Sequence, residues 1–387
     1  MTRPRTNICL NMIVKNEEKV LPRLFRSVKD YIDYYVIVDT GSSDGTIELI
    51  KREMAGFGIE GEVHERPWVN FGVNRQQALE LAVKAGRADW VLFIDADEEL
   101  GVSDPEFYEK LEAGVSYDIE KHQDGVRYAV PHLLNIKENR YEWRGPVHNY
   151  IMTLKGPKRR SLRHDVWIVY HLGEGAKSHG VTLEEKHLRD ARLLEKDLEE
   201  NPDNPRSQFY LGQSYRDAGL LEEAYRAYEK RVSMKGWEEE RFVAQLEMGR
   251  IAVRRDDPED VVLRDLLAAY ELRPTRAEPL HELAKYFRSK KLWGKAFCFA
   301  KAGVNTRKPD DRLFVAQAIY DWMMADELAV AASWVGDYEV SKLGSEHVLA
   351  RVEQGLEIPK EEVQRVRKNL AFVLGKLAET SDDASRA

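Results

Sequence analysis

Residues Trp90–Leu100 read W-V-L-F-I-D-A-D-E-E-L and constrain the fold more than any other segment of the chain. The five apolar residues that open this run predict a strand buried in an α/β core. Asp95 and Asp97 follow at its carboxyl end, with Glu98 and Glu99 directly behind. Ligands of open α/β sheets bind beyond the carboxyl ends of strands, so these carboxylates are candidates to hold Mg²⁺ or Mn²⁺ together with substrate phosphates. The other interpretation is an acidic turn after a core strand, which explains most isolated D-x-D triplets.

Length and composition narrow the class of protein. The chain has 387 residues, of which 43% are hydrophobic, which is enough for two or three domains. Its formal net charge of −8 argues against wholesale binding of nucleic acid. The two cysteines, Cys9 and Cys298, lie far apart in the sequence and predict buried thiols instead of a disulfide framework. Met1–Arg5 shows no signal-peptide pattern and no apolar run is long enough to span a bilayer, so we expect a soluble, cytoplasmic protein.

Strands and helices alternate along roughly the first hundred residues. The predicted strands cover residues 7–14, 34–39, 61–66 and 90–95. The predicted helices cover residues 20–30, 46–54 and 74–85. This alternation predicts a mostly parallel sheet with right-handed crossovers.

Four motifs in this region occur in a specific order. They read M-I-V-K-N-E-E, V-I-V-D-T-G-S-S-D-G-T, N-F-G-V-N-R-Q-Q-A-L and V-L-F-I-D-A-D-E-E. Each motif alone is weak, but their order and spacing over about 90 residues resemble the nucleotide-sugar-binding half of family 2 glycosyltransferases, which have the GT-A fold.

The resemblance implies roles in binding a sugar nucleotide. The Asp39 carboxylate and the backbone of Met12 and Ile13 are expected beside the base, typically uracil. Asp44 is expected near the nucleotide, and Arg75 near the diphosphate, where a charge-assisted bond to phosphate is strong. The alternatives are a turn or cap role for the two aspartates and a solvated helix position for the arginine.

The resemblance also implies a metal site. Asp95 would face the ribose, and Asp97 would bind the Mg²⁺ or Mn²⁺ that bridges the two phosphates and neutralises charge on the leaving group. His171, in V-Y-H-L-G, is the expected third metal ligand and suits Mn²⁺ better than Mg²⁺. A structural histidine at a strand end is the other interpretation.

Residues 101–182 are expected to form the acceptor half, with strand material at residues 125–134, 141–154 and 166–171. The motif W-R-G-P-V-H resembles the branch of family 2 enzymes with tetratricopeptide repeats, and it places His148 near the acceptor or the diphosphate. Family members commonly have glutamate after this histidine, where this chain has Asn149. An inverting transfer needs a general base, for which Glu142, His148, Glu99 and Glu98 are the candidates.

Lys155–Arg163 forms the densest basic cluster of this acidic chain. Such a cluster could bind an anionic acceptor, including nucleic acid or a phosphorylated carrier. A solvated hairpin is the commoner explanation.

The sequence pattern changes near Thr182 from mixed strands and helices to continuous helices. Thr182 is the expected N-cap of a helix over Leu183–Asn201. Tetratricopeptide-like spacing, with a period of about 34 residues, then predicts stacked helix pairs that build a core together. The residues that fit the repeats are Leu211, Gly212, Tyr215, Gly219, Ala224, Tyr228, Ala269, Pro274, Leu280, Leu283, Phe287, Ala296 and the segment Phe314–Trp334. Most tryptophans here are expected in the core. A last helix, Lys360–Ala378, would cap the array.

We therefore expect an α/β plus all-α protein. The expected domains are a GT-A domain at 1–182, with a donor half at 1–100 and an acceptor half at 101–182, repeats at 183–378 and a disordered tail at 379–387. The resemblance implies an inverting, metal-dependent transfer of a sugar from a nucleoside diphosphate to a peptide or protein. The expected donor is a UDP-sugar. A modified nucleobase in DNA or a surface glycan is the alternative acceptor.

The repeats could present the acceptor, form a homo-oligomer or brace the catalytic domain. Two interpretations that assign the chain a function other than glycosyl transfer stay open. One is a non-catalytic scaffold on a degenerate GT-A domain, against which the intact acidic and basic motifs argue. The other is a nucleotidyltransferase, against which the lack of glycine in M-I-V-K-N-E-E argues.

Overall fold

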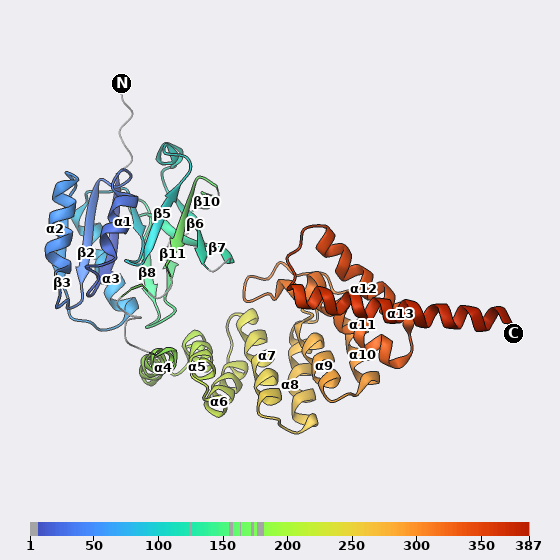
Figure 1. The fold of residues 1–387 in the computed structure, drawn as a ribbon. Helices are drawn as coiled ribbons and strands as arrows, with labels where there is room; N and C mark the ends of the chain where they lie inside the picture. The colour runs from blue at the N-terminus through green and yellow to red at the C-terminus, as the bar shows by residue number, and fades with distance from the viewer. Residues whose placement is uncertain are drawn as a thin grey trace. The chain divides into compact units, whose positions relative to one another are not determined.

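The computed structural model describes residues 7–123, 126–154, 158–162, 164–171, 174–175 and 182–386. The chain forms two compact units, Met1–Pro202 and Asp203–Ala387. Figure 1 shows a mixed strand–helix unit followed by a purely helical one, as the sequence predicts.

The first unit is built on a mixed sheet with the order β3-β2-β1-β4-β7-β6-β11-β5, and β10 pairs with β6. The donor-half strands are β1 (Ile8–Val14), β2 (Tyr34–Asp39), β3 (Glu60–Glu65) and β4 (Trp90–Phe93). These pair in parallel, so their carboxyl ends meet at one edge. The remaining strands are β5 (Glu98–Val102), β6 (Val115–Gln123), β7 (Val126–Asn135), β10 (Lys158–Ser161) and β11 (Val166–Tyr170). Antiparallel pairing begins at β4 and β7, so the sheet is less parallel than expected.

Helices cover both faces of the parallel strands. Leu10 and Met12 of β1 share a core cluster with α1 (Leu21–Val28) and α2 (Thr46–Gly56). Cys9, on the opposite face of β1, packs in the cluster that contains Leu79 of α3 (Phe71–Ala85). Strand β1 is therefore buried on both sides, which explains its unbroken apolar sequence.

Two parts of the acceptor half differ from the prediction. The single strand expected over 141–154 is a hairpin of β8 (Tyr141–Arg144) and β9 (Tyr150–Thr153), joined through Gly145, whose φ of 89° requires glycine. Strands β5 and β6 were not predicted. The alternation of Val115, Tyr117 and Ile119 with polar residues is the signal for β6.

Helix α4 (Leu183–Glu200) begins where the sequence predicts. Thr182 accepts from the Glu185 amide at 3.1 Å, and the Glu185 carboxylate accepts from the Thr182 amide at 2.9 Å, which completes a capping box. The helix belongs to the first compact unit, although its sequence groups it with the repeats. Helical periodicity does not reveal which neighbour a helix packs against.

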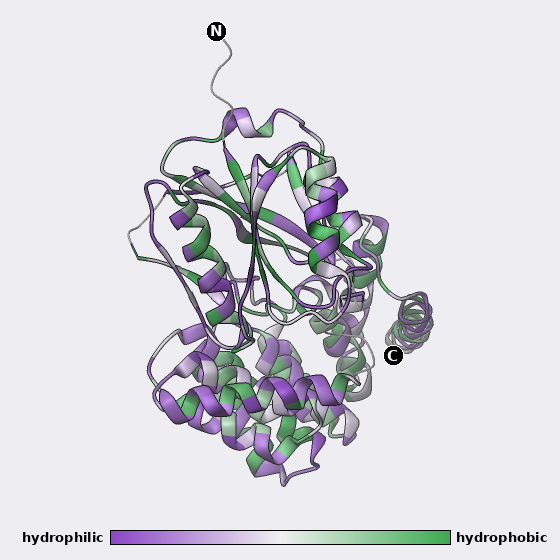
Figure 2. Ribbon diagram, turned by 90° about the vertical axis from the view of Figure 1, so that its left-hand side faces the viewer, coloured by the Kyte–Doolittle hydropathy of each residue, from purple (hydrophilic) through white to green (hydrophobic). Residues whose placement is uncertain are grey.

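The second unit contains the helices α5 (Pro205–Asp217), α6 (Leu221–Ser233), α7 (Glu238–Arg254), α8 (Glu259–Leu272), α9 (Glu278–Ser289), α10 (Trp293–Gly303), α11 (Met324–Val335), α12 (Tyr338–Glu353) and α13 (Lys360–Arg386). Successive helices pack as antiparallel neighbours, and Figure 2 shows hydrophobic and hydrophilic residues interleaved along them. A Cβ at Gly212 would lie 2.7 Å from the Tyr228 ring, so this glycine leaves room for the tyrosine between the two helices of the repeat.

Several details of the second unit correct the prediction. Phe314 is not helical, because the fourth pair starts later, with a π-helical turn η3 (Ile319–Met323) that leads into α11. Helix α13 continues to Arg386, through most of the segment expected to be disordered. Cys298 is exposed, and Trp334 is 65% exposed instead of filling the core. In the described residues we find no helix with the length and apolar character needed to cross a membrane.

Candidate functional site

The loop after β1 is fastened to the turn after β2. The Asn16 amide donates to Ser42 Oγ at 2.9 Å, and Asn16 Oδ1 accepts from the Ser43 amide at 2.7 Å. The Glu17 amide donates to Thr46 Oγ1 at 2.9 Å. Asn16 adopts a φ of 57°, a left-handed conformation that asparagine tolerates. The K-N-E-E and T-G-S-S-D-G-T motifs thus form one rim at the carboxyl ends of neighbouring strands.

Both aspartates of the second motif are bonded within their own turn. Asp39 is 1% exposed, and its Oδ1 accepts from the amides of Gly41 at 2.9 Å and Ser42 at 2.8 Å. Asp44 Oδ1 accepts from the Thr46 amide at 3.1 Å, at the start of α2. These contacts give each carboxylate a structural task. Their contact with a nucleotide stays a prediction.

A cavity of about 350 Å³ opens beside this rim, a size suited to a small ligand. Its lining residues are Ile13, Val14, Lys15, Asn16, Glu17, Thr40, Trp68, Phe71, Arg189 and Leu193. Ile13 was predicted to lie at the binding site. The Met12 side chain instead joins the core, in keeping with a role limited to its backbone.

The aromatic wall and the α4 side of this cavity were not predicted. Trp68 and Phe71 meet edge to face with ring centroids 4.8 Å apart, and Trp68 is 39% exposed. The sequence signal for this wall is limited to two aromatic residues, Trp68 and Phe71, just before a predicted helix. Arg189 and Leu193 come from a helix more than a hundred residues later, and no local pattern marks them.

Arg75 and Asp95, which were predicted to lie near the diphosphate and the ribose, pair with each other. Arg75 Nη2 lies 2.5 Å from Asp95 Oδ1, and the guanidinium stands over the Trp143 ring at 5.1 Å from its centroid. Partial burial would raise the pKa of Asp95, but the charges of Arg75 and Lys121 outweigh it and hold the pKa below its ordinary value. Asp95 is therefore an anion engaged by a cation from α3.

Asp97 has the opposite electrostatic environment. Burial and the neighbouring charges of Asp95 and Glu98 raise the pKa of Asp97 to about 6. Glu98, 1% exposed, pairs with Lys121 and accepts from the Asp95 amide at 2.8 Å. Glu98 therefore positions the D-x-D loop and is too enclosed to serve as a base.

His171 lies next to the D-x-D loop, opposite Asp97 along the β5–β11 pair. Its amide donates to the Asp97 carbonyl at 3.0 Å, and its Nε2 lies 3.1 Å from Glu99 Oε2. A carboxylate on one ring nitrogen is the usual partner of a metal-binding histidine, and a metal bound here would be held by Nδ1. A Cβ at Gly175 would lie 2.7 Å from the Asp97 carboxylate, so this glycine leaves room for it.

The loop of the β8–β9 hairpin lies against the start of α3. The Phe71 amide donates to the Pro146 carbonyl at 3.2 Å, and Asn149 Oδ1 accepts from Arg75 Nη1 at 3.4 Å. His148 is exposed and has a φ of 46°, an uncommon conformation for histidine. The loop therefore brings Asn149 to the Arg75–Asp95 pair, and His148 precedes it in the sequence.

Glu142 is placed differently from the other base candidates. Its carboxylate lies 2.9 Å from Arg144 Nη2. Trp143, its neighbour on β8, faces Arg75, and successive side chains of a strand point to opposite faces. Glu142 therefore points away from the Arg75–Asp95 pair.

Within the described ranges, no group of three or more His, Cys, Asp or Glu side chains could hold a metal ion alone. Mg²⁺ and Mn²⁺ sites in phosphate-handling proteins commonly use one or two carboxylates plus substrate phosphates. Asp97, with His171 beside its loop, fits such a partial site.

The basic cluster Lys155–Arg163 lies partly outside the described residues, which leave out 155–157 and 163. Of its described members, Arg159 pairs with Asp118 and Arg160 with Glu112. These pairs argue against a free anion-binding patch. The hairpin interpretation is wrong for the described residues, because Lys158–Ser161 forms the strand β10, which pairs in parallel with β6.

Comparisons with known proteins show what the chain is similar to in sequence. The family model described as glycosyl transferase family 2 matches residues 9–165. The chain is 25% identical over 249 residues to the SPbeta prophage-derived glycosyltransferase SunS of Bacillus subtilis, covering 58% of this chain and 53% of that protein. It is 37% identical over 94 residues to a TPR repeat-containing protein of Synechococcus elongatus, covering 24% and 21%, and 36% identical over 89 residues to an uncharacterized glycosyltransferase of Rickettsia typhi, covering 23% and 27%.

Among solved structures, MamA matches at 17% identity with a TM-score of 0.35, over 45% of this chain and 97% of that one. The alignments to the curated relatives span only about a fifth to a half of their own lengths. Residues 9–165, with their parallel donor half and D-x-D loop, are a family 2 glycosyl transferase domain.

Proposed function

We propose that this protein is a metal-dependent glycosyltransferase that transfers a sugar, with inversion, from a UDP-sugar to a peptide or protein. The observation that carries the proposal is the placement of two features on adjacent parallel strands. The cavity opens at the carboxyl end of β1, and the Arg75–Asp95 pair and Asp97 follow β4, its hydrogen-bonded neighbour. A base-sized cavity next to a cation and two carboxylates suits a nucleoside diphosphate with its metal.

The donor would bind across these two features. The base would enter the cavity between the backbone of Ile13 and the Trp68–Phe71 wall. Arg75, already charged and oriented by Asp95, would contact the diphosphate. Asp97 and His171 would hold Mg²⁺ or Mn²⁺, which when bound supplies positive charge against the departing diphosphate.

The acceptor would be deprotonated from the side of the hairpin loop. His148 is exposed there and lies next to Asn149, which contacts Arg75. Imidazole is the side chain that enzymes use most often as a general base. Glu99 is bonded to His171 and would orient it.

The kind of acceptor is inferred from the second unit. A stacked helical array offers a long surface for a macromolecule and has no evident use for a small acceptor. A peptide or protein therefore fits better than a monosaccharide. A modified nucleobase in DNA fits less well, because the described arginines of the basic cluster are paired within the first unit.

A screen of nucleoside-diphosphate sugars tests the proposal without knowledge of the acceptor. Thermal shift and slow donor hydrolysis would be measured with Mn²⁺, with Mg²⁺ and with chelator. We expect a UDP-sugar to stabilise the protein only in the presence of metal. Equal stabilisation in chelator, or no response to any sugar nucleotide, would contradict the proposal.

A further inference from the structure

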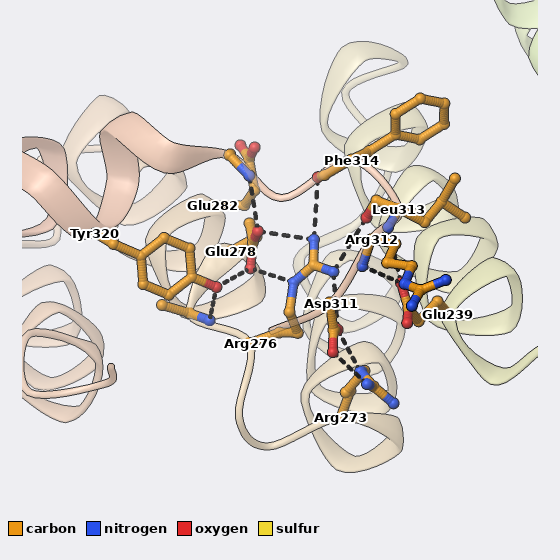
Figure 3. Close-up of polar contacts among 12 residues, drawn as sticks. Glu239, Arg273, Arg276, Glu278, Glu282, Asp311, Arg312, Leu313, Phe314 and Tyr320 are labelled. Atoms are coloured by element: carbon orange, nitrogen blue, oxygen red, sulfur yellow. Dashed lines mark hydrogen bonds and ion pairs between the residues drawn. The ribbon is translucent and has the colours of Figure 1, made fainter. Parts of the chain in front are cut away.

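Some buried ion pairs of this chain fasten one segment to another. Figure 3 shows such a pair in the second unit, where Arg276 and Glu278 are fully buried and lie 2.8 Å apart. Arg276 also donates to the carbonyls of Leu313 at 3.2 Å and Phe314 at 3.0 Å. These contacts hold the extended segment 311–316 in place, so the pair has a structural task.

Another buried pair, Lys121 with Glu98, lies at the D-x-D loop of the first unit. Three alternate residues of β6, Val115, Tyr117 and Ile119, are buried in the core cluster of that unit. Lys121 is the next residue in this alternation, at a position where the pattern predicts one more apolar side chain. The strand therefore ends its row of core residues with a cation, whose side chain is only 16% exposed.

The next two strands of the sheet also change from apolar to polar at this end. On β11 the buried Ile168 is followed two residues later by Tyr170, and on β5 the buried Leu100 is preceded by Glu98. Tyr170 is the register partner of Glu98, and Ile168 is the register partner of Lys121. Because alternate residues of a strand share a face, Lys121, Tyr170 and Glu98 lie on one face of the sheet.

The three side chains contact one another through the lysine. Lys121 Nζ pairs with Glu98 Oε1 and stands over the Tyr170 ring, 4.7 Å from its centroid. Burial alone would lower the pKa of Lys121, but the charge of Glu98 outweighs it, so the pKa is raised and the lysine stays a cation. A single ammonium group therefore joins β5, β6 and β11 at this end of the sheet.

One contact of Lys121 leads to Asp97. Glu98 follows Asp97 in the sequence, and its amide donates to the Asp95 carbonyl at 3.0 Å. The Glu98 carboxylate in turn accepts from the Asp95 amide at 2.8 Å. These two bonds close the turn that carries Asp97, and Lys121 fixes the carboxylate that makes one of them.

The other contact of Lys121 leads to His171. Tyr170 directly precedes His171, whose amide donates to the Asp97 carbonyl at 3.0 Å. A buried ion pair often adds little net stability, because the loss of hydration of two charges offsets their attraction. The place of Lys121 between the segments of Asp97 and His171 gives the pair a different use, which is to fix their geometry.

We infer that Lys121 is a positioning residue of the metal site and holds the segments of Asp97 and His171 in the arrangement that Mg²⁺ or Mn²⁺ requires. It acts through Glu98 and Tyr170 and does not itself contact the metal or the sugar nucleotide. By pairing with Glu98 it also keeps that carboxylate from binding the metal in place of Asp97. The inference rests on the proposed function, because it takes Asp97 and His171 as the metal ligands.

Metal binding by the full-length protein tests this inference. Electron paramagnetic resonance of free Mn²⁺ measures how much metal is bound, with and without UDP, and calorimetry measures UDP affinity with Mn²⁺ and in chelator. Lys121→Met keeps most of the side-chain length and removes the charge. We expect this variant to bind Mn²⁺ with UDP about tenfold more weakly, as is usual when a group that orients metal ligands is lost. Lys121→Arg keeps the charge and should recover most of the affinity.

A double variant keeps the test valid if the unpaired Glu98 harms folding. Lys121→Met/Glu98→Gln leaves no buried charge without a partner, and glutamine can still accept from the Asp95 amide. In chelator it should therefore unfold near the wild-type temperature. It should still bind Mn²⁺ with UDP about tenfold more weakly, because the cation that joins the two segments is absent.

Lys110→Met is the matched control. Lys110 also pairs with a carboxylate of the first unit, Asp165 at 2.9 Å, but Asp165 precedes β11, at the end of that strand opposite to Tyr170. This variant should bind Mn²⁺ and UDP as the wild type does.

Two outcomes would overturn the inference and leave the proposed function intact. One is normal Mn²⁺ and UDP affinity in the double variant, since any loss in Lys121→Met would then come from the unpaired Glu98. The other is an equal loss in Lys110→Met. A wild type that binds neither Mn²⁺ nor UDP would overturn the proposed function, and the inference with it.

Discussion

Arg75 and Asp95 form an ion pair with 2.5 Å between Nη2 and Oδ1, although one lies on α3 and the other follows β4. The pair fixes a guanidinium at the carboxyl end of the central strands and keeps the neighbouring carboxylate ionised. Asn149 Oδ1 shares the same guanidinium at 3.4 Å. The hairpin loop, the helix and the D-x-D loop therefore meet at one arginine.

We expect Arg75→Gln to weaken UDP binding and to raise the pKa of Asp95. Because the pKa of Asp95 is lowered in the folded protein, this carboxylate stabilises the fold at any pH above its ordinary pKa. The stabilisation is lost as the pH falls through the lowered pKa. Without Arg75, unfolding at pH 7 should require about 0.5–1 kcal/mol less, because the pair is partly exposed. Calorimetric UDP titration and denaturant unfolding measure both effects. Arg87→Gln, an exposed arginine paired with Glu60, should change neither.

Asp97→Asn should abolish metal-dependent UDP binding and remove a pH dependence of stability. Because the pKa of Asp97 is raised to about 6, its ionisation costs stability as the pH rises from about 4 to about 6. Without metal, the wild type should therefore unfold at a higher temperature at pH 5 than at pH 7. In the variant, the difference in the free energy of unfolding between pH 5 and pH 7 should be smaller by about 1 kcal/mol, a value already reduced for the partial exposure of Asp97. Normal metal-dependent UDP affinity in the variant would refute the role of Asp97.

Arg189→Gln tests whether α4 belongs to the donor cavity. Arg189 lines the cavity, so its loss should weaken UDP by about threefold to tenfold without a change in melting temperature. Arg192→Gln is the control on the same helix, because Arg192 is exposed and does not line the cavity. If both variants bind UDP as the wild type does, the donor does not contact α4.

His148→Asn should lower kcat by about a hundredfold or more and leave UDP affinity unchanged, as expected for the loss of a general base. Asparagine tolerates the left-handed conformation, so the loop should keep its shape. His164→Asn is a matched control, since His164 is also exposed and has a φ of 71°. A kcat that is normal in the first variant would assign the base elsewhere.

Arg276→Ala should destabilise the second unit by about 3–5 kcal/mol, because it leaves the buried Glu278 without its cation and takes from Asp311 one of its two arginine partners, Arg273 being the other. Denaturant unfolding followed by circular dichroism measures the loss. Arg226→Gln, on the surface of α6, should change stability by less than about 0.5 kcal/mol. A small effect of Arg276→Ala would mean that segment 311–316 is held by other contacts.

The amino-acid sequence by itself determined the elements whose signals are local. The apolar runs of β1, β2 and β4, the capping box of Thr182 and Glu185, and the pairing of Gly212 with Tyr228 all follow from residues close to one another in the chain. The sequence also marked Arg75, Asp95 and Asp97, because each belongs to a motif of fixed spacing.

Only the tertiary structure decided which distant groups meet. It put His171 beside the loop of Asp97, and Arg189 of α4 on the wall of a cavity that begins at β1. It also placed the backbone of residues 312–316 on Glu239, Arg276 and Glu278. These contacts join strands, helices and loops far apart in the sequence. Several of them are made by backbone groups, and the pattern of side chains in a sequence does not show which backbone groups will be bonded. Periodicity reports that a segment is helical or extended, whereas the choice of its neighbours depends on the packing of the whole unit.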